Sequence, residues 1–200
     1  FFEKIIDFSY HYADKIIALS KGVSNDIKSR TKVKKEKIKV IYNPINIDFI
    51  EKEKKANISG KYAQMFSNKK VLKIINIGHL QNQKGQDLLI KAVSEIKGIP
   101  FYLFIVGEGE QRNNLENLID KLGLRNKVFL LGFQRNPYKF LSNSDIFVLS
   151  SRWEGFGHVI VEAMATGTTV ISTNCRSGPS EIIKNNYDGV LCRPNNVKDI

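Results

Sequence analysis

The chain has 200 residues, of which 42% are hydrophobic and 26% are charged, and this composition is typical of an α/β protein with one complete core and part of a second. No apolar run approaches the roughly 20 residues of a membrane-spanning helix, and the Cys and His spacings indicate neither a disulfide framework nor a metal site. Much of the net charge of +11 lies in residues 1–73, which hold 17 Lys or Arg against 8 Asp or Glu. This excess fits either a solvated lysine-rich surface or contact with an anionic membrane. Nucleic acid is disfavoured, because aromatic residues are not interleaved with the lysines.

The first 70 residues carry short patterns that predict small elements. Residues 48–70 are rich in Lys and Glu and poor in periodicity, so we expect a linker with some helix. A helix over 23–30 is expected to take its polar start from Ser24, Asn25 and Asp26. In chain order, the patterns predict a helix in 1–13, a strand in 15–20, the helix 23–30, a strand in 37–42 and a turn at Asn43 and Pro44.

From Val71 the pattern becomes a regular alternation of short apolar strands and amphipathic helices. Such alternation predicts an α/β fold with a doubly wound, Rossmann-like parallel sheet. The loops 78–85, 107–109, 132–135 and 150–157 all follow strands, so they should share the carboxyl edge of the sheet, where ligands bind. The predicted strands are 71–77, 100–106, 127–131, 145–149, 168–172 and 189–192, and the predicted helices are 85–97, 110–122, 136–143, 157–166 and 179–185.

The most informative segment runs from Glu154 to Glu162, two carboxylates with seven residues between them. Glu154 lies in a glycine-flanked loop after an apolar strand, and Glu162 lies inside the following helix. A strand, a glycine loop and a helix start together present backbone N–H groups and a positive helix end to an anion. A carboxylate further along can accept hydrogen bonds from sugar hydroxyls. The segment therefore predicts a ligand that is both phosphorylated and rich in hydroxyls.

This segment resembles the signature of the retaining GT-B glycosyltransferases of family 4, also called glycosyl transferases group 1. Other segments match the family in the same order, and together they span roughly residues 70–195: Ile77–Gly85, Phe104–Gly109, Leu131–Phe133, Ser144–Ile146 and Ala163–Ile171. The resemblance implies that residues 1–47 are the end of an N-terminal acceptor domain, 48–70 a linker and 71–200 a nucleotide-sugar donor domain truncated at its end. Because the chain begins at Phe1, we expect a fragment that binds nucleotide but transfers sugar poorly on its own.

The resemblance assigns catalysis to two residues. Lys84 would neutralise the leaving diphosphate, and Glu154 would contact hydroxyls of the donor sugar. Glu162 would bind the ribose. His79 stands where the family usually has Arg, and a neutral His is a weaker phosphate partner than a bidentate Arg. The plainer alternatives are an exposed Lys84, a Glu154 placed only by the helix dipole, a Glu162 on the surface or in a salt bridge and a His79 without a role.

Two further groups complete the implied donor site. Gly155 and Gly157 would allow close backbone approach, and N–H groups of the same segment would face the sugar or diphosphate. That segment continues through Phe156, His158 and Val159. The loop of Phe133 and Gln134 would meet the base through its backbone. Ser177–Glu181 is similar to a Ser-Gly-Pro segment before a Glu in relatives that transfer galactose-like or N-acetylated sugars, although a turn with a helix N-cap explains the same residues.

The resemblance thus implies a glycosyltransferase (hexosyltransferase) that uses a nucleotide-diphospho-sugar, most simply a UDP-sugar, without a cofactor. No metal is expected, since Asp-x-Asp does not occur. The expected acceptor is a glycan or lipid-linked chain in bacterial cell-surface polysaccharide synthesis. The cytoplasm is the expected location, with peripheral contact at the inner face of the cell membrane as a possibility left by the basic first third. The alternatives are an epimerase or phosphorylase on the same fold, or a non-catalytic sugar-nucleotide-binding subunit.

Overall fold

The computed structural model describes residues 2–200, with side chains from Ile6 onward apart from Asp7; the first residue of the predicted helix 1–13 lies outside this range. The elements, in chain order, are α1 (Phe2–Tyr12), β1 (Ile16–Ala18), α2 (Lys21–Arg30), β2 (Ile38–Val40), α3 (Ile47–Glu53), α4 (Ala63–Ser67), β3 (Leu72–Ile77), α5 (Gln86–Ser94), β4 (Phe101–Val106), α6 (Arg112–Lys121), β5 (Val128–Gly132), α7 (Tyr138–Leu141), β6 (Ile146–Leu149), α8 (His158–Thr166), β7 (Thr169–Thr173), α9 (Pro179–Ile182) and β8 (Val190–Cys192). Short 3₁₀ turns lie at Lys35–Lys37, Gly60–Tyr62 and Asn82–Lys84.

The main sheet has six parallel strands in the order β5-β4-β3-β6-β7-β8. The doubly wound parallel sheet predicted from the sequence is therefore confirmed. The order runs one way from β3 to β5 and the other way from β6 to β8. The chain switches direction between β3 and β6, and the loops after these two strands lie on either side of the crevice that such a switch creates.

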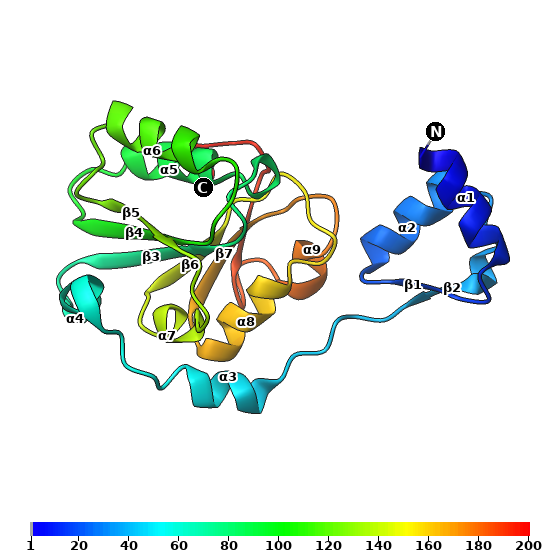
Figure 1. The fold of residues 1–200 in the computed structure, drawn as a ribbon, viewed down its shortest axis with the longest axis horizontal. Coiled ribbons are helices and arrows are strands. Elements are labelled where there is room, and N and C mark those ends of the chain that lie inside the picture. Colours follow the sequence, from blue (N-terminus) through cyan, green and yellow to red (C-terminus); the bar gives the residue numbers. More distant parts are fainter. Residues whose placement is uncertain (1) are drawn as a thin grey trace.

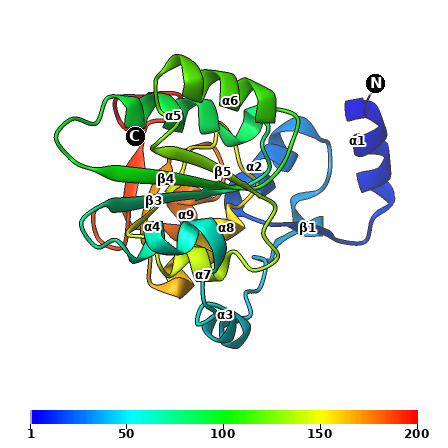
Figure 2. The same ribbon diagram turned by 60° about the vertical axis from the view of Figure 1, so that its left-hand side comes forward.

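Helices cover both faces of this sheet (Figures 1 and 2). Successive side chains of a strand point to opposite faces, and the core divides accordingly. Ile74 of β3 packs in the cluster beneath α5 and α6, and Ile75 packs in the cluster with α7 and α8. Because both faces are buried, the strands read as continuous apolar runs, which is why the sequence located them closely.

The N-terminal part forms a small separate layer beside the sheet (Figure 1). Strands β1 and β2 lie within the predicted strands 15–20 and 37–42, and they pair in parallel. Helix α2 follows β1. The predicted polar start of this helix is wrong. Ser20, not Ser24, is the N-cap, because its backbone is extended and its hydroxyl accepts a hydrogen bond from the Val23 N–H. Ser24 is a buried residue inside the helix.

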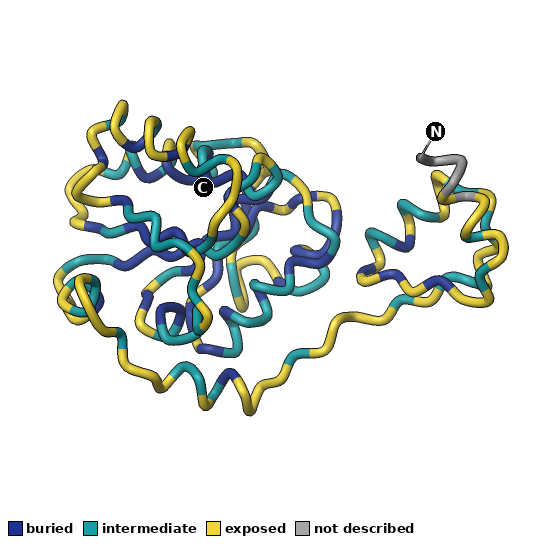
Figure 3. The backbone as a smooth tube through the Cα atoms, viewed as in Figure 1, coloured by how far each residue is buried: buried dark blue, intermediate teal, exposed yellow. Residues whose placement is uncertain are grey.

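The segment between the two layers is exposed at first and then packs on the core. The tube in Figure 3 is almost entirely exposed from β2 to the start of α3. Ile50 of α3 is buried, and Phe66 of α4 stacks on Phe104 of β4 with 4.2 Å between ring centroids. The last part of this segment therefore contributes to the core that supports the carboxyl edge of β4.

Two further predictions concern membrane-spanning helices and the two cysteines. No described helix is both long and apolar enough to cross a membrane. Cys175 and Cys192 are buried free thiols, as expected from their apolar surroundings. Burial, with a smaller contribution from the charge of Glu154, raises the pKa of Cys175 to about 11. Cys175 therefore lies close enough to the Glu154 loop to sense its charge.

Candidate functional site

Glycines bring the loops after β3 and β4 into direct contact. A Cβ on Gly107 would lie 2.0 Å from the carbonyl oxygen of Gly78, and one on Gly109 would lie 2.4 Å from that of Leu80. Both distances are far below van der Waals contact, so only glycine fits at these positions. The Gly-x-Gly after β4 is thus explained by packing of one loop on the next.

The loop after β3 is joined in the same way to the loop after β6. Gly85 has a left-handed conformation (φ +61°), and a Cβ there would lie 2.2 Å from the carbonyl oxygen of Ser150. The Ser150 hydroxyl donates to the carbonyl oxygen of Lys84 at 2.9 Å. Arg152 forms two 2.9 Å hydrogen bonds to the carboxylate of Asp87. Burial opposes ionisation of Asp87, but these bonds and the Arg152 charge outweigh it and hold its pKa below the usual range.

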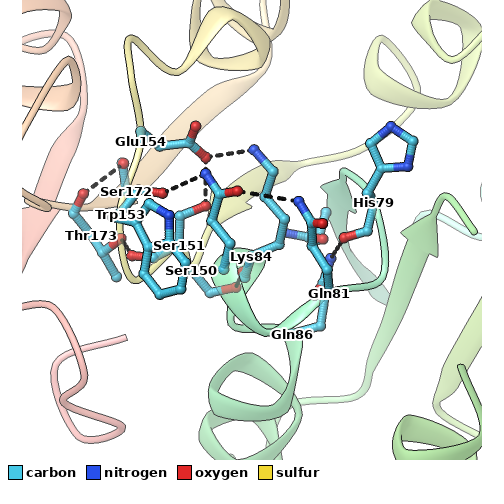
Figure 4. Close-up of polar contacts among 12 residues, drawn as sticks. His79, Gln81, Lys84, Gln86, Ser150, Ser151, Trp153, Glu154, Ser172 and Thr173 are labelled. Carbon is cyan, nitrogen blue, oxygen red and sulfur yellow. Dashed lines mark hydrogen bonds and ion pairs between the residues drawn. The ribbon is translucent and has the colours of Figure 1, made fainter. Parts of the chain in front are cut away.

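Joining these loops brings together the two residues that the resemblance makes catalytic. The ammonium of Lys84 lies 2.7 Å from Oε1 of Glu154, and the hydroxyl of Ser151 donates to the same oxygen at 2.7 Å. The side chains are 18% and 7% exposed. Figure 4 shows the pair spanning the space between the two loops. It is a largely buried ion pair at the carboxyl edge of the sheet, where the sequence predicts a ligand.

His79 does not join this cluster. It is an exposed residue, and Figure 4 shows its ring apart from the Lys84 ammonium. Its backbone carbonyl is used instead, because it accepts a hydrogen bond from the side chain of Gln86 at 3.0 Å. The position is therefore near the site, but no contact of the imidazole with Lys84 or Glu154 supports a role for its ring.

The segment after Glu154 leads directly into α8. Gly157 is the N-cap residue in a left-handed conformation (φ +88°), and no side chain caps the helix that begins at His158. Its first N–H groups are therefore available to an anion. Phe156 is buried and packs on the ring of Tyr42, with 5.3 Å between centroids. The carbonyl of Gly155 accepts a 2.7 Å hydrogen bond from Ser20.

Glu162 lies one turn into α8, and its partner is a residue that the sequence did not indicate. The hydroxyl of Tyr138 donates to Oε1 of Glu162 at 3.0 Å, and Nε2 of His158 is 4.0 Å from the same oxygen. The Glu162 side chain is 20% exposed. Burial, with the charge and hydrogen bond of Glu162, raises the pKa of Tyr138 to about 12. The phenol therefore remains a donor at neutral pH.

The remaining predicted residues divide between surface and interior. Phe133 is 75% exposed, and Gln134 turns back to donate to the Leu131 carbonyl at 2.9 Å. Val159 packs against the core cluster that includes Ile160, so its side chain supports α8 and only its N–H can serve a ligand.

Comparison with known proteins identifies the family. A family model described as glycosyl transferases group 1 matches residues 59–200. The chain belongs to this family. An uncharacterized glycosyltransferase of Methanocaldococcus jannaschii is 39% identical over 96% of this chain and 45% of its own length. An N-acetylgalactosaminyltransferase of Campylobacter jejuni that acts on N-acetylgalactosamine-N,N'-diacetylbacillosaminyl-diphospho-undecaprenol is 32% identical over 96% of this chain and 50% of its own length.

Solved structures of glycosyltransferases have the same fold as this member of the glycosyl transferases group 1 family. Anabaena Alr3699/HepE in complex with UDP-glucose matches with a TM-score of 0.86 at 26% identity, over 98% of this chain and 54% of that chain. The six-stranded parallel sheet is that of GT-B glycosyltransferase structures. The chain spans about half the length of the curated relatives that it matches along most of its own length.

Three functional contacts were missed at the level of sequence. Ser151 bonds to Glu154 within the same loop, whereas Tyr138 and Glu181 each bond to a residue on another element. Ser151 could have been found, because it lies just after a predicted strand and three residues before Glu154. Tyr138 lies 24 residues before Glu162, and no periodicity relates the two. Glu181 was read only as part of a sugar-specificity motif or of a helix cap.

Proposed function

We propose that this chain is the donor-binding part of a retaining glycosyltransferase that uses a nucleotide-diphospho-sugar. The observation that carries the proposal is the Lys84–Glu154 pair, which lies at the carboxyl edge of the sheet beside the uncapped start of α8. A cation, a carboxylate and free N–H groups in one place match a ligand that carries both phosphates and hydroxyls.

In this proposal the Lys84 ammonium and the Glu154 carboxylate, which pair with each other in the structure, bind different parts of the donor. Lys84 stabilises the negative charge that develops on the diphosphate as the glycosidic bond breaks. Glu154 accepts hydrogen bonds from sugar hydroxyls. Ser151 holds the carboxylate when Lys84 turns toward phosphate, because its hydroxyl bonds to the same oxygen. The buried pair thus stays satisfied before the donor arrives, and the donor replaces only one partner of each group.

Glu162 serves the nucleotide end. Tyr138 and His158 both approach Oε1, and Oε2 has no donor within the described part of the chain. A ribose diol offers the hydroxyl donors that this oxygen lacks. The loop after β5, which carries Phe133 and Gln134, then meets the base through its backbone.

The family relatives support a particular donor and acceptor. Alr3699/HepE is a structural neighbour in complex with UDP-glucose, which favours a UDP-sugar here. The Campylobacter jejuni relative acts on an undecaprenol-linked acceptor, and a relative in Rhizobium meliloti is named for lipopolysaccharide core biosynthesis. We therefore propose a glycan or lipid-linked acceptor in surface polysaccharide synthesis.

Calorimetric titration of the chain with UDP, GDP and ADP tests the proposal. UDP should saturate one site, and Lys84→Met should weaken UDP binding about tenfold, which corresponds to about 1.4 kcal/mol. Lys91→Met is the matched control, because Lys91 lies on the exposed face of α5 and pairs only loosely with Asp87, at 3.7 Å. Saturation by none of the three nucleotides, or equal weakening by both substitutions, would contradict the donor site.

A further inference from the structure

Glu181 joins the donor domain to the N-terminal layer. Its carboxylate accepts hydrogen bonds from the backbone N–H groups of Lys21 (2.8 Å) and Gly22 (2.9 Å) and from the hydroxyl of Tyr42 (2.9 Å). All three donors are about 140 to 160 positions away in sequence. One carboxylate on α9 therefore holds both the start of α2 and the start of the segment that follows β2.

The chemistry of this contact is that of a helix cap supplied from another domain. The first N–H groups of a helix lack partners within it, and a carboxylate there also interacts favourably with the helix dipole. Ser20 caps the Val23 N–H, so Glu181 takes the two donors that Ser20 leaves. Burial opposes ionisation of Glu181, but the hydrogen bonds from Gly22, Lys21 and Tyr42 lower its pKa overall.

The two layers approach so closely that glycine is required at the contact. A Cβ on Gly22 would lie 2.5 Å from Oγ and 2.9 Å from Cα of Ser177. Arg176 adds an ion pair to Asp26 of α2 at 3.0 Å. Backbone is thus packed on backbone at this point, and the hydrogen bonds of Glu181 have little freedom to shift.

The same contact reaches the donor loop. Ser20, beside the N–H groups held by Glu181, donates to the carbonyl of Gly155 at 2.7 Å. Tyr42, which also bonds Glu181, packs its ring on Phe156. The two residues that follow Glu154 are therefore both held by groups that Glu181 fixes.

We infer that Glu181 is a positioning residue for the donor sugar: through Ser20 and Tyr42 it holds the loop that carries Glu154. This inference rests on the proposed function, in which Glu154 contacts the sugar. It gives the Ser-Gly-Pro-Ser-Glu segment a different role from direct sugar recognition, because the Glu181 carboxylate is already engaged by three donors. Glu162 lies outside this network, so the nucleotide end should not depend on Glu181.

Two substitutions break the contact from opposite sides. Glu181→Gln places an amide N–H₂ group against a backbone donor, and Gly22→Ala introduces the clash with Ser177. Glu95→Gln is the matched control, since Glu95 is exposed at the end of α5. Cooperative thermal melting by circular dichroism should show that each variant folds, and the two independent variants guard against a failure of either one.

The readouts are calorimetric dissociation constants for UDP and for UDP-glucose, UDP-galactose and UDP-N-acetylglucosamine, together with acrylamide quenching of Trp153. Trp153 is the single tryptophan, is exposed and precedes Glu154. Both variants should raise the dissociation constant of the best-bound UDP-sugar about fivefold and change that of UDP by no more than about twofold. Both should also change the acrylamide quenching of Trp153. Equal weakening of UDP and UDP-sugar, or no weakening of either, would overturn the inference. If the native chain bound no nucleotide, the proposed function would fail, and unchanged Trp153 quenching would separately overturn the positioning role.

Discussion

The two glutamates of the signature segment are held in opposite ways. Glu154 is the more buried, at 7% exposure, and its charge is balanced by Lys84. Glu162 is 20% exposed, and its hydrogen-bonding partner is the neutral hydroxyl of Tyr138. The first therefore depends on a charge that a ligand would compete for, and the second depends on a donor that leaves one oxygen open.

This difference suggests how the segment from Glu154 to Glu162 can bind both the sugar end and the nucleotide end of one donor. The Glu154 side is built from loops locked by glycines and by contact with the N-terminal layer. The Glu162 side is a helix whose position is set by the core beneath it. Disturbing the loops should therefore cost stability and sugar recognition, whereas disturbing Glu162 or Tyr138 should act mainly on the nucleotide.

The largest expected effect comes from the glycine that locks the loops. Gly85→Ala should lower the free energy of unfolding by about 3 kcal/mol, because the new Cβ meets the Ser150 carbonyl oxygen and the backbone has positive φ. Gly167→Ala, at the end of α8, also has positive φ but meets nothing within 4 Å, so it should cost only about 1 kcal/mol. Urea denaturation measures both, and equal losses would show that the loops are not locked.

Loss of the Lys84 charge should come next. Lys84→Met leaves the Glu154 carboxylate with only the Ser151 hydroxyl, and we expect a loss of about 2 kcal/mol in the free energy of unfolding. Lys54→Met removes an ion pair with the more exposed Glu51 and should change stability by no more than about 0.5 kcal/mol. A Lys84→Met chain as stable as the control would mean that the pair contributes nothing to the loop structure.

Much of the fold was predictable because strands that are buried on both faces have continuous apolar sequences. The apolar runs of β3, β4 and β6 are buried on both faces, and this environment admits few other readings. Element ends were less accurate. The predicted helix 136–143 is only α7, 138–141, since the ends are set by tertiary contacts such as Ser142 bonding to the Lys54 carbonyl.

The site was predictable only as far as local pattern reaches. Sequence order placed Lys84 and Glu154 at the same edge of the sheet, and the structure brings them within 2.7 Å. The partners Tyr138 and Glu181 could not be predicted, because each belongs to a different element from the residue it holds. Such contacts follow from three-dimensional packing, and a single sequence carries no periodic signal for them.

Removing the hydroxyl of Tyr138, which donates to Glu162, should have a moderate effect on stability that depends on pH. Tyr138→Phe should cost about 1 kcal/mol of stability at neutral pH and weaken UDP about threefold. The pKa of Tyr138 is raised from 10.0 to about 12, so its stabilisation is complete below pH 10 and is lost as pH rises toward 12. The urea midpoint should therefore fall less between pH 9 and pH 11 in Tyr138→Phe than in the native chain. Tyr187→Phe, at a 79% exposed residue, should behave like the native chain, and identical pH dependence in all three would contradict this account.

The smallest effect is a chemical one at Cys175. Burial and then the charge of Glu154 raise the pKa of this thiol to about 11, so Glu154→Gln should lower that pKa and speed iodoacetamide alkylation about twofold at pH 8. Cys192 is the internal control, because burial and Asp199 raise its pKa. Peptide mass spectrometry gives both rates, and equal acceleration at the two thiols would point to general loosening.

The most direct test of the division between the two glutamates is a crossed calorimetric titration of Glu154→Gln and Glu162→Gln with UDP and with the best-bound UDP-sugar. The account predicts that Glu162→Gln weakens both ligands about equally, by roughly tenfold, and that Glu154→Gln weakens the UDP-sugar while UDP binding is kept. If Glu154→Gln weakened UDP as strongly as the UDP-sugar, or if Glu162→Gln left UDP binding unchanged, the assignment of sugar to one glutamate and ribose to the other would be contradicted.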